Sequence, residues 1–298
     1  KIKQIMGRTR ASIPLGFEKH KDIQDTKYMP KLDIDSLPIV SREHQKALRQ
    51  VGTLGGGNHF IDLLKDQNGN LWIMIHSGSR NLGHTVAEYY NRVAIEKRST
   101  YKSQIPSNWE LDYLLVESDK GQNYINEMQY CVEFALCNRK LMITRVMDII
   151  HETLAHKIEW EEIINIAHNY AELEEHFGEK VWVHRKGATK AYADLVGIIP
   201  GSQGTPSFIV KGKGNPDSFK SCSHGAGRAM SRTKAIKELD MNKEIAKLEV
   251  KGILHGIRGQ RSLDEAPGAY KDIMKVIDEQ VDLIDIVEVL EPIAVVKE

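Results

Sequence analysis

The sequence has few cysteines and no excess of either charge. Cys131, Cys137 and Cys222 are the three cysteines among 298 residues, and none stands in a CxxC pair. This argues against a disulfide framework and is typical of a reducing cytoplasm. Lys+Arg and Asp+Glu both number 41, which disfavours a purely electrostatic clamp on nucleic acid but allows a local basic patch. Because no apolar run reaches about eighteen residues, we predict neither a membrane span nor a signal peptide.

Familiar nucleotide-binding motifs are also absent. The loop at residues 197–207 is rich in glycine and serine and could present amides and hydroxyls to an anion. No Gly-Lys-Ser/Thr follows it in the required register, so it is not a Walker A loop. No GxGxxG opens a helix after a strand, which argues against a Rossmann fold. No repeat or low-complexity linker is present, and the simplest expectation is one mixed α+β domain over residues 1–298.

Hydrophobic periodicity predicts alternating strands and helices. Residues 1–50 read as irregular, because Pro14, Pro30 and Pro38 break any long element. Strands are expected at 59–64, 71–76, 163–167, 180–184 and 207–211, with a β-like tail at 284–297. Helices are expected at 84–98, 122–156, 231–247 and 270–281. The chain starts at Lys1, and its opening residues read like the interior of a longer protein.

Two histidines flank a predicted hairpin whose turn is Asn68-Gly69. With these as the central turn residues, His76 lies opposite Ile61, and His59 is two residues further along the same face. Such diagonal neighbours are about 7–8 Å apart at Cα, close enough for both imidazoles to bind one metal ion or two adjacent ones. Alternatively, the histidines merely end two strands. Glycines before the first histidine and a Ser-Gly-Ser-Arg run after the second favour the metal site.

Two further histidines have a polar setting. His168 follows the predicted strand at 163–167 and precedes Asn169, and it could complete a ligand set. His224 stands in Ser-Cys-Ser-His-Gly-Ala-Gly-Arg (residues 221–228), where small residues leave its ring accessible and Arg228 offers donors to phosphate. A tight structural turn is the alternative there. A histidine beside a phosphate cradle indicates a general acid/base or a nucleophile that forms a phosphoramidate. The remaining candidates read as structural or solvated: His84, His176 and His184.

The residues that carry these features resemble the RtcB family of GTP- and manganese-dependent RNA ligases. The matching stretches run in the family's order from about residue 50 to the C-terminus. They are residues 52–60, 76–80, 168–170, 185–188, 197–207, 221–233, 265–267 and 270–272. The resemblance implies an α+β domain of the RtcB type, with β-hairpins around a metal and nucleotide site and helices flanking it.

The resemblance also implies a reaction and its residues. A histidine attacks the α-phosphate of GTP. The GMP then moves to an RNA 3′-phosphate, which arises by opening a 2′,3′-cyclic phosphate, and a 5′-hydroxyl displaces it. Motif by motif, His224 is the implied nucleophile, and the implied manganese ligands are His59, His76 and His168. The implied nucleotide contacts are Asn58, Ser202, Ser207, Tyr270 and Lys297, and the implied RNA-phosphate contacts are Arg80 and Arg228. A cytoplasmic location and an activator of the archease type also follow.

Two departures from the family pattern stand out. Family members carry an upstream Asp-x-Gly-Cys-Gly segment whose aspartate and cysteine bind the metals, and no such segment occurs here. Three neutral imidazoles alone would balance the charge of two divalent ions poorly, so we expect that roughly the first quarter of the protein is missing. Asp62 stands where the family has glutamate and is one methylene shorter. The alternatives to a ligase are a metal-dependent phosphodiesterase and an impaired fragment that binds nucleotide or RNA.

Overall fold

The computed structural model describes residues 1–155, 158–161 and 163–298. By their contacts, these residues form two compact units. Unit 1 comprises Lys1–Glu18, Leu54–His76 and Met142–Glu298, and unit 2 comprises Lys19–Thr53 and Ser77–Leu141. Helix α4 (Asp119–Leu154) contributes residues to both. The mixed α+β class is confirmed, whereas the expectation of one domain over 1–298 stays a prediction.

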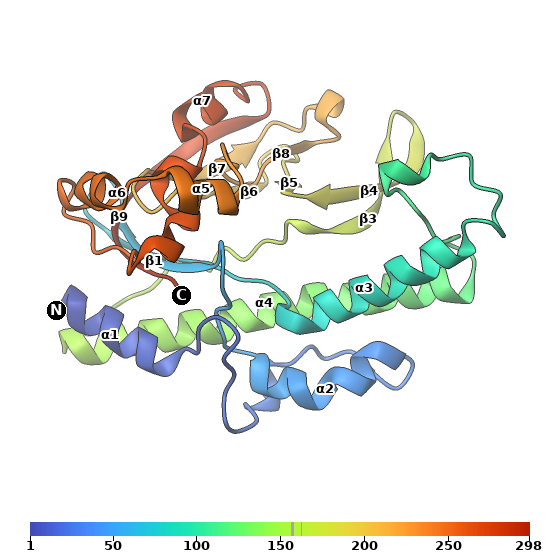
Figure 1. The fold of residues 1–298 in the computed structure, drawn as a ribbon, viewed down its shortest axis with the longest axis horizontal. Helices are drawn as coiled ribbons and strands as arrows, with labels where there is room; N and C mark the ends of the chain where they lie inside the picture. Colours follow the sequence, from blue (N-terminus) through green and yellow to red (C-terminus); the bar gives the residue numbers. More distant parts are fainter. Residues whose placement is uncertain (156–157, 162) are drawn as a thin grey trace. The chain divides into compact units, whose positions relative to one another are not determined.

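Unit 1 is built on a five-stranded antiparallel sheet with strand order β2-β1-β9-β7-β6 (Figure 1). The strands are β1 (Phe60–Lys65), β2 (Leu71–His76), β6 (Val196–Ile199), β7 (Ser207–Gly212) and β9 (Ile284–Val296). Ile61 and Leu63 of β1 pack with α1 (Ile2–Ser12) and with the Met142–Leu154 part of α4. Because side chains alternate along a strand, Phe60 and Asp62 point to the other face.

Two small ribbons and three short helices complete unit 1 (Figure 1). One ribbon pairs β3 (Asn169–His176) with β4 (Glu179–Lys186), and the other pairs β5 (Ala188–Lys190) with β8 (Ser221–Ser223). The helices are α5 (Arg232–Glu238), α6 (Met241–Glu249) and α7 (Ile273–Asp278). Short 3-10 turns lie at Pro216–Ser218, Gln260–Glu265 and Pro267–Ala269.

Unit 2 is helical in its described part. Its elements are α2 (Pro38–Gln50), α3 (Arg80–Lys97), the Asp119–Leu141 part of α4 and 3-10 turns at Thr26–Tyr28 and Ser107–Trp109. Its core packs Val40 and Leu48 of α2 against Val86 and Tyr90 of α3 and Phe134 of α4. The first turn of α2 is capped by Glu127 of α4, whose Oε1 accepts from the backbone amides of Ile39 at 2.6 Å and Val40 at 2.8 Å.

Several expectations about these elements were wrong. Residues 1–50 contain α1 and α2, and Pro38 opens α2 rather than breaking it, because proline is tolerated in the first helical turn. The helix expected at 231–247 is divided at Asp240, which starts α6 by accepting from the amide of Lys243. Residues 163–167, where a strand was expected, form no strand.

The predicted hairpin is confirmed, but its register was wrong by one residue. His76 pairs with Phe60, not Ile61. The cause is the turn, where the Asp66 carboxylate accepts from the backbone amides of Asn68 and Asn70, each at 2.9 Å. This Asx-type turn closes a longer loop than a two-residue hairpin, with Gly69 at φ 84°. With this register, His59 is one residue from the partner of His76 and not two, and it precedes β1 instead of lying within it.

Candidate functional site

Four histidine rings gather in unit 1 at the start of β1 and the end of β2. The ring centroids of His59 and His76 are 5.7 Å apart, and those of His76 and His168 are 4.9 Å apart. The His224 ring lies 4.7 Å from His168 and 6.2 Å from His76. These side chains come from four separate segments, so the fold joins the implied metal ligands to the implied nucleophile.

The ring spacings fit imidazoles that share an ion. A ligating imidazole nitrogen lies about 2 Å from a metal, so the centroids of two rings on one ion are about 4.5–6.5 Å apart. All three implied ligands stand within this spacing of a neighbour. Nevertheless, within residues 1–155, 158–161 and 163–298, no three His, Cys, Asp or Glu side chains are arranged as a metal site. Imidazole is a ligand type that divalent metals accept, and the manganese site at these histidines stays a prediction.

A pocket of about 200 Å³ adjoins two of these histidines. His76 and His224 line it, together with Asn58 and with Asp62 of β1. The remaining lining residues come from the loop at 200–203, the segment at 225–228, Arg232, and the segments around Glu265, Tyr270 and Val295, with Phe60 and Lys297. The pocket therefore brings the nucleophile segment and the glycine-serine loop together.

Glu265 is the centre of a polar network in this pocket. Its buried carboxylate accepts from Arg228 Nη1 at 3.0 Å and Lys297 Nζ at 3.1 Å, and also from the Tyr270 hydroxyl. Arg232 Nε lies 3.5 Å from the same group. Burial raises the pKa of Glu265, but the Lys297 charge and the donated hydrogen bonds outweigh it and leave the pKa lowered. Three cations thus face one carboxylate, which gives the pocket a positive balance suited to phosphate.

Asp62 behaves differently. Its side chain is 5% exposed, and no described residue donates a hydrogen bond to its Oδ1. Burial raises the pKa of Asp62 to about 8, and the nearby Lys297 charge offsets only part of this. The carboxyl is therefore largely protonated at neutral pH.

The implied nucleotide contacts are distributed unevenly. Asn58, Ser202, Tyr270 and Lys297 line the pocket. Ser207 is buried beneath the loop, where its hydroxyl accepts from the amide of Gly201 at 3.1 Å and so holds the loop's shape. The roles of these five residues in nucleotide binding stay predictions.

The two implied RNA-phosphate arginines fall in different units. Arg228 lines the pocket, and its Nε donates to the carbonyl of Met230 at 3.0 Å while the guanidinium lies over the Tyr270 ring. Arg80 begins α3 in unit 2, where its Nε donates to Thr53 Oγ1 at 2.8 Å. Sequence reasoning gave no role to Arg232 or Glu265, although both lie in or beside stretches that it quoted. Only their contacts within the folded unit distinguish them.

Three other expectations can be compared with the structure. His176 is buried against Glu174, in agreement with a structural role. The three cysteines are free thiols. In the described part of the chain, none of the helices has the length and apolar character needed to span a bilayer.

Comparison with known proteins gives consistent matches. The family described as tRNA-splicing ligase RtcB matches residues 2–298. The RNA-splicing ligase RtcB of Escherichia coli is 40% identical over 258 residues, which cover 84% of this chain and 61% of that protein. The tRNA-splicing ligase RtcB of Nanoarchaeum equitans is 35% identical over 323 aligned residues, which cover 95% of this chain and 66% of that protein. The tRNA-splicing ligase RtcB of Thermococcus kodakarensis is 31% identical over 322 aligned residues, which cover 95% of this chain and 67% of that protein. The chain thus spans about 61% of the length of its Escherichia coli relative.

Proposed function

The chain belongs to the RtcB family, and from this premise we propose that it carries the nucleotide-transfer site of a GTP-dependent RNA ligase. The proposed substrates are RNA ends that bear a 3′-phosphate or 2′,3′-cyclic phosphate and a 5′-hydroxyl. The observation that carries the proposal is the position of His224, whose ring adjoins the implied metal ligands while it also lines a pocket with three cations.

In the first step, a ring nitrogen of His224 attacks the α-phosphorus of GTP. A phosphorus–nitrogen bond forms, and the bond to the bridging oxygen breaks and releases pyrophosphate. Arg228, Arg232 and Lys297 can bind the phosphate oxygens and offset their charge, which a neutral nucleophile requires. Ser202 of the loop at 200–203 adds a neutral polar side chain to the lining of the same pocket.

In the later steps, GMP passes from the histidine to the RNA 3′-phosphate, and the 5′-hydroxyl attacks the activated phosphate and releases GMP. Manganese, when bound, would neutralise phosphate charge as a Lewis acid, held by His59, His76 and His168. Arg80, which belongs to unit 2, is proposed to bind RNA phosphate. The proposal includes a cytoplasmic location and an archease-type activator.

The test is covalent labelling with α-labelled GTP and manganese, followed by denaturing electrophoresis. We expect a labelled band that mild acid removes, because a phosphoramidate is acid-labile, and we expect His224→Ala to abolish it. His184→Ala is the matched control, because this histidine is exposed on β4 and takes part in none of the described ring contacts of the four-histidine group. A label that survives in His224→Ala would refute the nucleophile assignment. RNA cleavage without any adduct, in this chain and in an N-terminally extended form, would favour the phosphodiesterase instead.

A further inference from the structure

The strand that leads into His224 is short and is entered by a strained turn. Strand β8 makes only three residue pairs, all with β5. The two residues before it, Phe219 and Lys220, have φ values of 53° and 49°. Residues other than glycine rarely adopt this left-handed conformation, and two in succession persist only when the surroundings hold them. The position of His224 therefore depends on whatever holds this turn.

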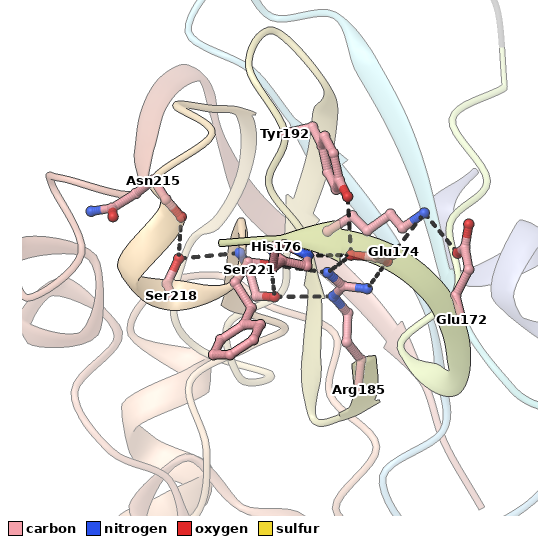
Figure 2. Close-up of polar contacts among 10 residues, drawn as sticks. Glu172, Glu174, His176, Arg185, Tyr192, Asn215, Ser218 and Ser221 are labelled. Atoms are coloured by element: carbon pink, nitrogen blue, oxygen red, sulfur yellow. Dashed lines mark hydrogen bonds and ion pairs between the residues drawn. The ribbon is translucent and has the colours of Figure 1, made fainter. Parts of the chain in front are cut away.

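Arg185 of β4 holds both sides of the turn. Its Nε donates to Ser221 Oγ at 3.0 Å, and its Nη2 donates to the carbonyl of Phe219 at 3.1 Å (Figure 2). These two contacts bracket Lys220. The Arg185 side chain is itself buried, with 1% exposed, so water does not compete for its donors.

Glu174 of β3 fixes the orientation of Arg185. Its two carboxylate oxygens accept from Nη1 at 2.5 Å and Nη2 at 2.9 Å, a bidentate pair that sets the plane of the guanidinium. His176 Nε2 and the Tyr192 hydroxyl also contact the Glu174 carboxylate, at 2.9 and 3.0 Å (Figure 2). Burial raises the pKa of Glu174, but these hydrogen bonds outweigh it and lower the pKa to about 2. The carboxylate therefore stays ionised across the working pH range.

The end of β4, the strand that carries Arg185, also adjoins the His224 ring. Gly187 follows β4 with φ 72°, and a side-chain carbon added to it would lie 3.5 Å from Cε1 and Nδ1 of His224. At the far end of β8, Gln280 binds Ser223 through its amide, with Oε1 accepting from the backbone at 3.0 Å and Nε2 donating to the hydroxyl at 2.8 Å. The imidazole thus extends from a segment that is held at both ends.

We propose that Glu174 and Arg185 are positioning residues for His224. The buried pair holds the Phe219–Ser221 turn, so that β8 presents the imidazole to the α-phosphate in one orientation. This inference rests on the proposed function for the identity of the phosphate. The competing interpretation is that the pair only stabilises the β3–β4 ribbon.

Single-turnover labelling with α-labelled GTP separates the two interpretations. Arg185→Lys keeps the charge but loses the bidentate fork. Ser221→Ala removes the hydrogen bond from Arg185 Nε and the bond that the Ser221 hydroxyl donates to the Phe219 carbonyl, while leaving the Glu174–Arg185 pair intact. We expect both variants to lower the maximal labelling rate by about 10- to 100-fold, as small misplacements of a reacting group do. The GTP concentration for half-maximal rate should stay within about twofold, because the phosphate contacts are unchanged. Glu175→Gln is the control, since this exposed carboxylate of β3 contacts neither Glu174 nor Arg185 among the described contacts and should leave the rate unaltered.

A second readout does not need GTP. The Cε1–H resonance of His224, assigned by its loss in His224→Ala, should shift or broaden in Arg185→Lys and Ser221→Ala and not in Glu175→Gln. If the parent chain takes no label, the proposed function fails while this resonance still tests the positioning role. An unchanged resonance in both variants overturns the inference, as does a loss of labelling rate that only accompanies unfolding of the ribbon, measured by circular dichroism.

Discussion

Replacement of Asp62 by asparagine should stabilise the protein. The Asp62 carboxyl is buried on β1, and burial raises its pKa from 3.8 to about 8 despite the positive charge of Lys297. Asparagine has nearly the same shape and carries no charge at any pH. The variant therefore removes the cost of burying an ionisable group without creating a cavity.

The size of the effect follows from the two pKa values. Between pH 4 and pH 8 the folded state keeps a proton that the unfolded state has released, so the free energy of unfolding falls as the pH rises through this range. Each tenfold change in proton affinity is worth about 1.4 kcal/mol, which places the cost near 4 kcal/mol at pH 7. Asp62→Asn can recover at most this amount, or about 8 °C in Tm at roughly 2 °C per kcal/mol for a chain of this size.

The assay is thermal unfolding at pH 5, 6, 7 and 8 for the parent chain and for Asp62→Asn. We expect the Tm difference to be small at pH 5 and to widen with pH. Asp66→Asn is the control with the opposite sign. Burial raises the pKa of Asp66, but hydrogen bonds from Trp72, Asn70 and Asn68 outweigh it and lower the pKa, so losing this carboxylate should destabilise the turn. A Tm difference for Asp62→Asn that stays constant from pH 5 to pH 8 would refute the reasoning, as would a lower Tm for that variant at pH 8.

Three further changes test the packing of each unit. Glu127→Ala should destabilise unit 2 by about 1–3 kcal/mol in urea unfolding, because it strips the cap from α2, and Glu127→Gln should lose less. Asn138→Ala should cost about 2–4 kcal/mol in the same assay, because its buried amide contacts backbone groups of Gly52, Thr53 and Gly78 and the Ser77 hydroxyl. Gly201→Ala should lower the Tm and GTP labelling, because the new carbon would lie 2.2 Å from the carbonyl oxygen of Pro206, whereas Gly69→Ala meets no described atom within 4 Å and should cost about 1 kcal/mol.

Local sequence signals predicted those elements whose patterns are confined to a few neighbouring residues. The β1–β2 hairpin, the long helix α4 and the final strand β9 all follow from periodicity over a short window. The hairpin register failed because one side chain, Asp66, enlarged the turn, and a shift of one residue changes every pairing. The expectation of irregular structure over residues 1–50 was wrong at α2, because Pro38 can open a helix as well as interrupt one.

The residues of the candidate site likewise fall into those that a local sequence signal marks and those that only the fold identifies. Motif residues such as His59, His76 and His224 could be found because glycine and hydroxyl neighbours mark them in the sequence. Glu265 could not be assigned its part, because its partners Arg228 and Lys297 are 37 and 32 residues away along the chain. Arg185 likewise looks like an ordinary strand residue until Glu174 and Ser221 are placed beside it. Pairings of this kind arise from the fold and leave no local pattern.

The Glu265 network has a consequence for the thermodynamics of ligand entry. Arg228 and Lys297 are already immobilised by a protein carboxylate, so the rotamer entropy of these long side chains is lost during folding and not during binding. The polyphosphate of the proposed GTP substrate would meet an array of cations whose geometry is set in advance, and it would share them with Glu265. Affinity at such a site depends less on the ordering of mobile cationic side chains during binding and more on how well the ligand's oxygens match the positions of the fixed donors. The pocket therefore favours ligands by shape as much as by charge.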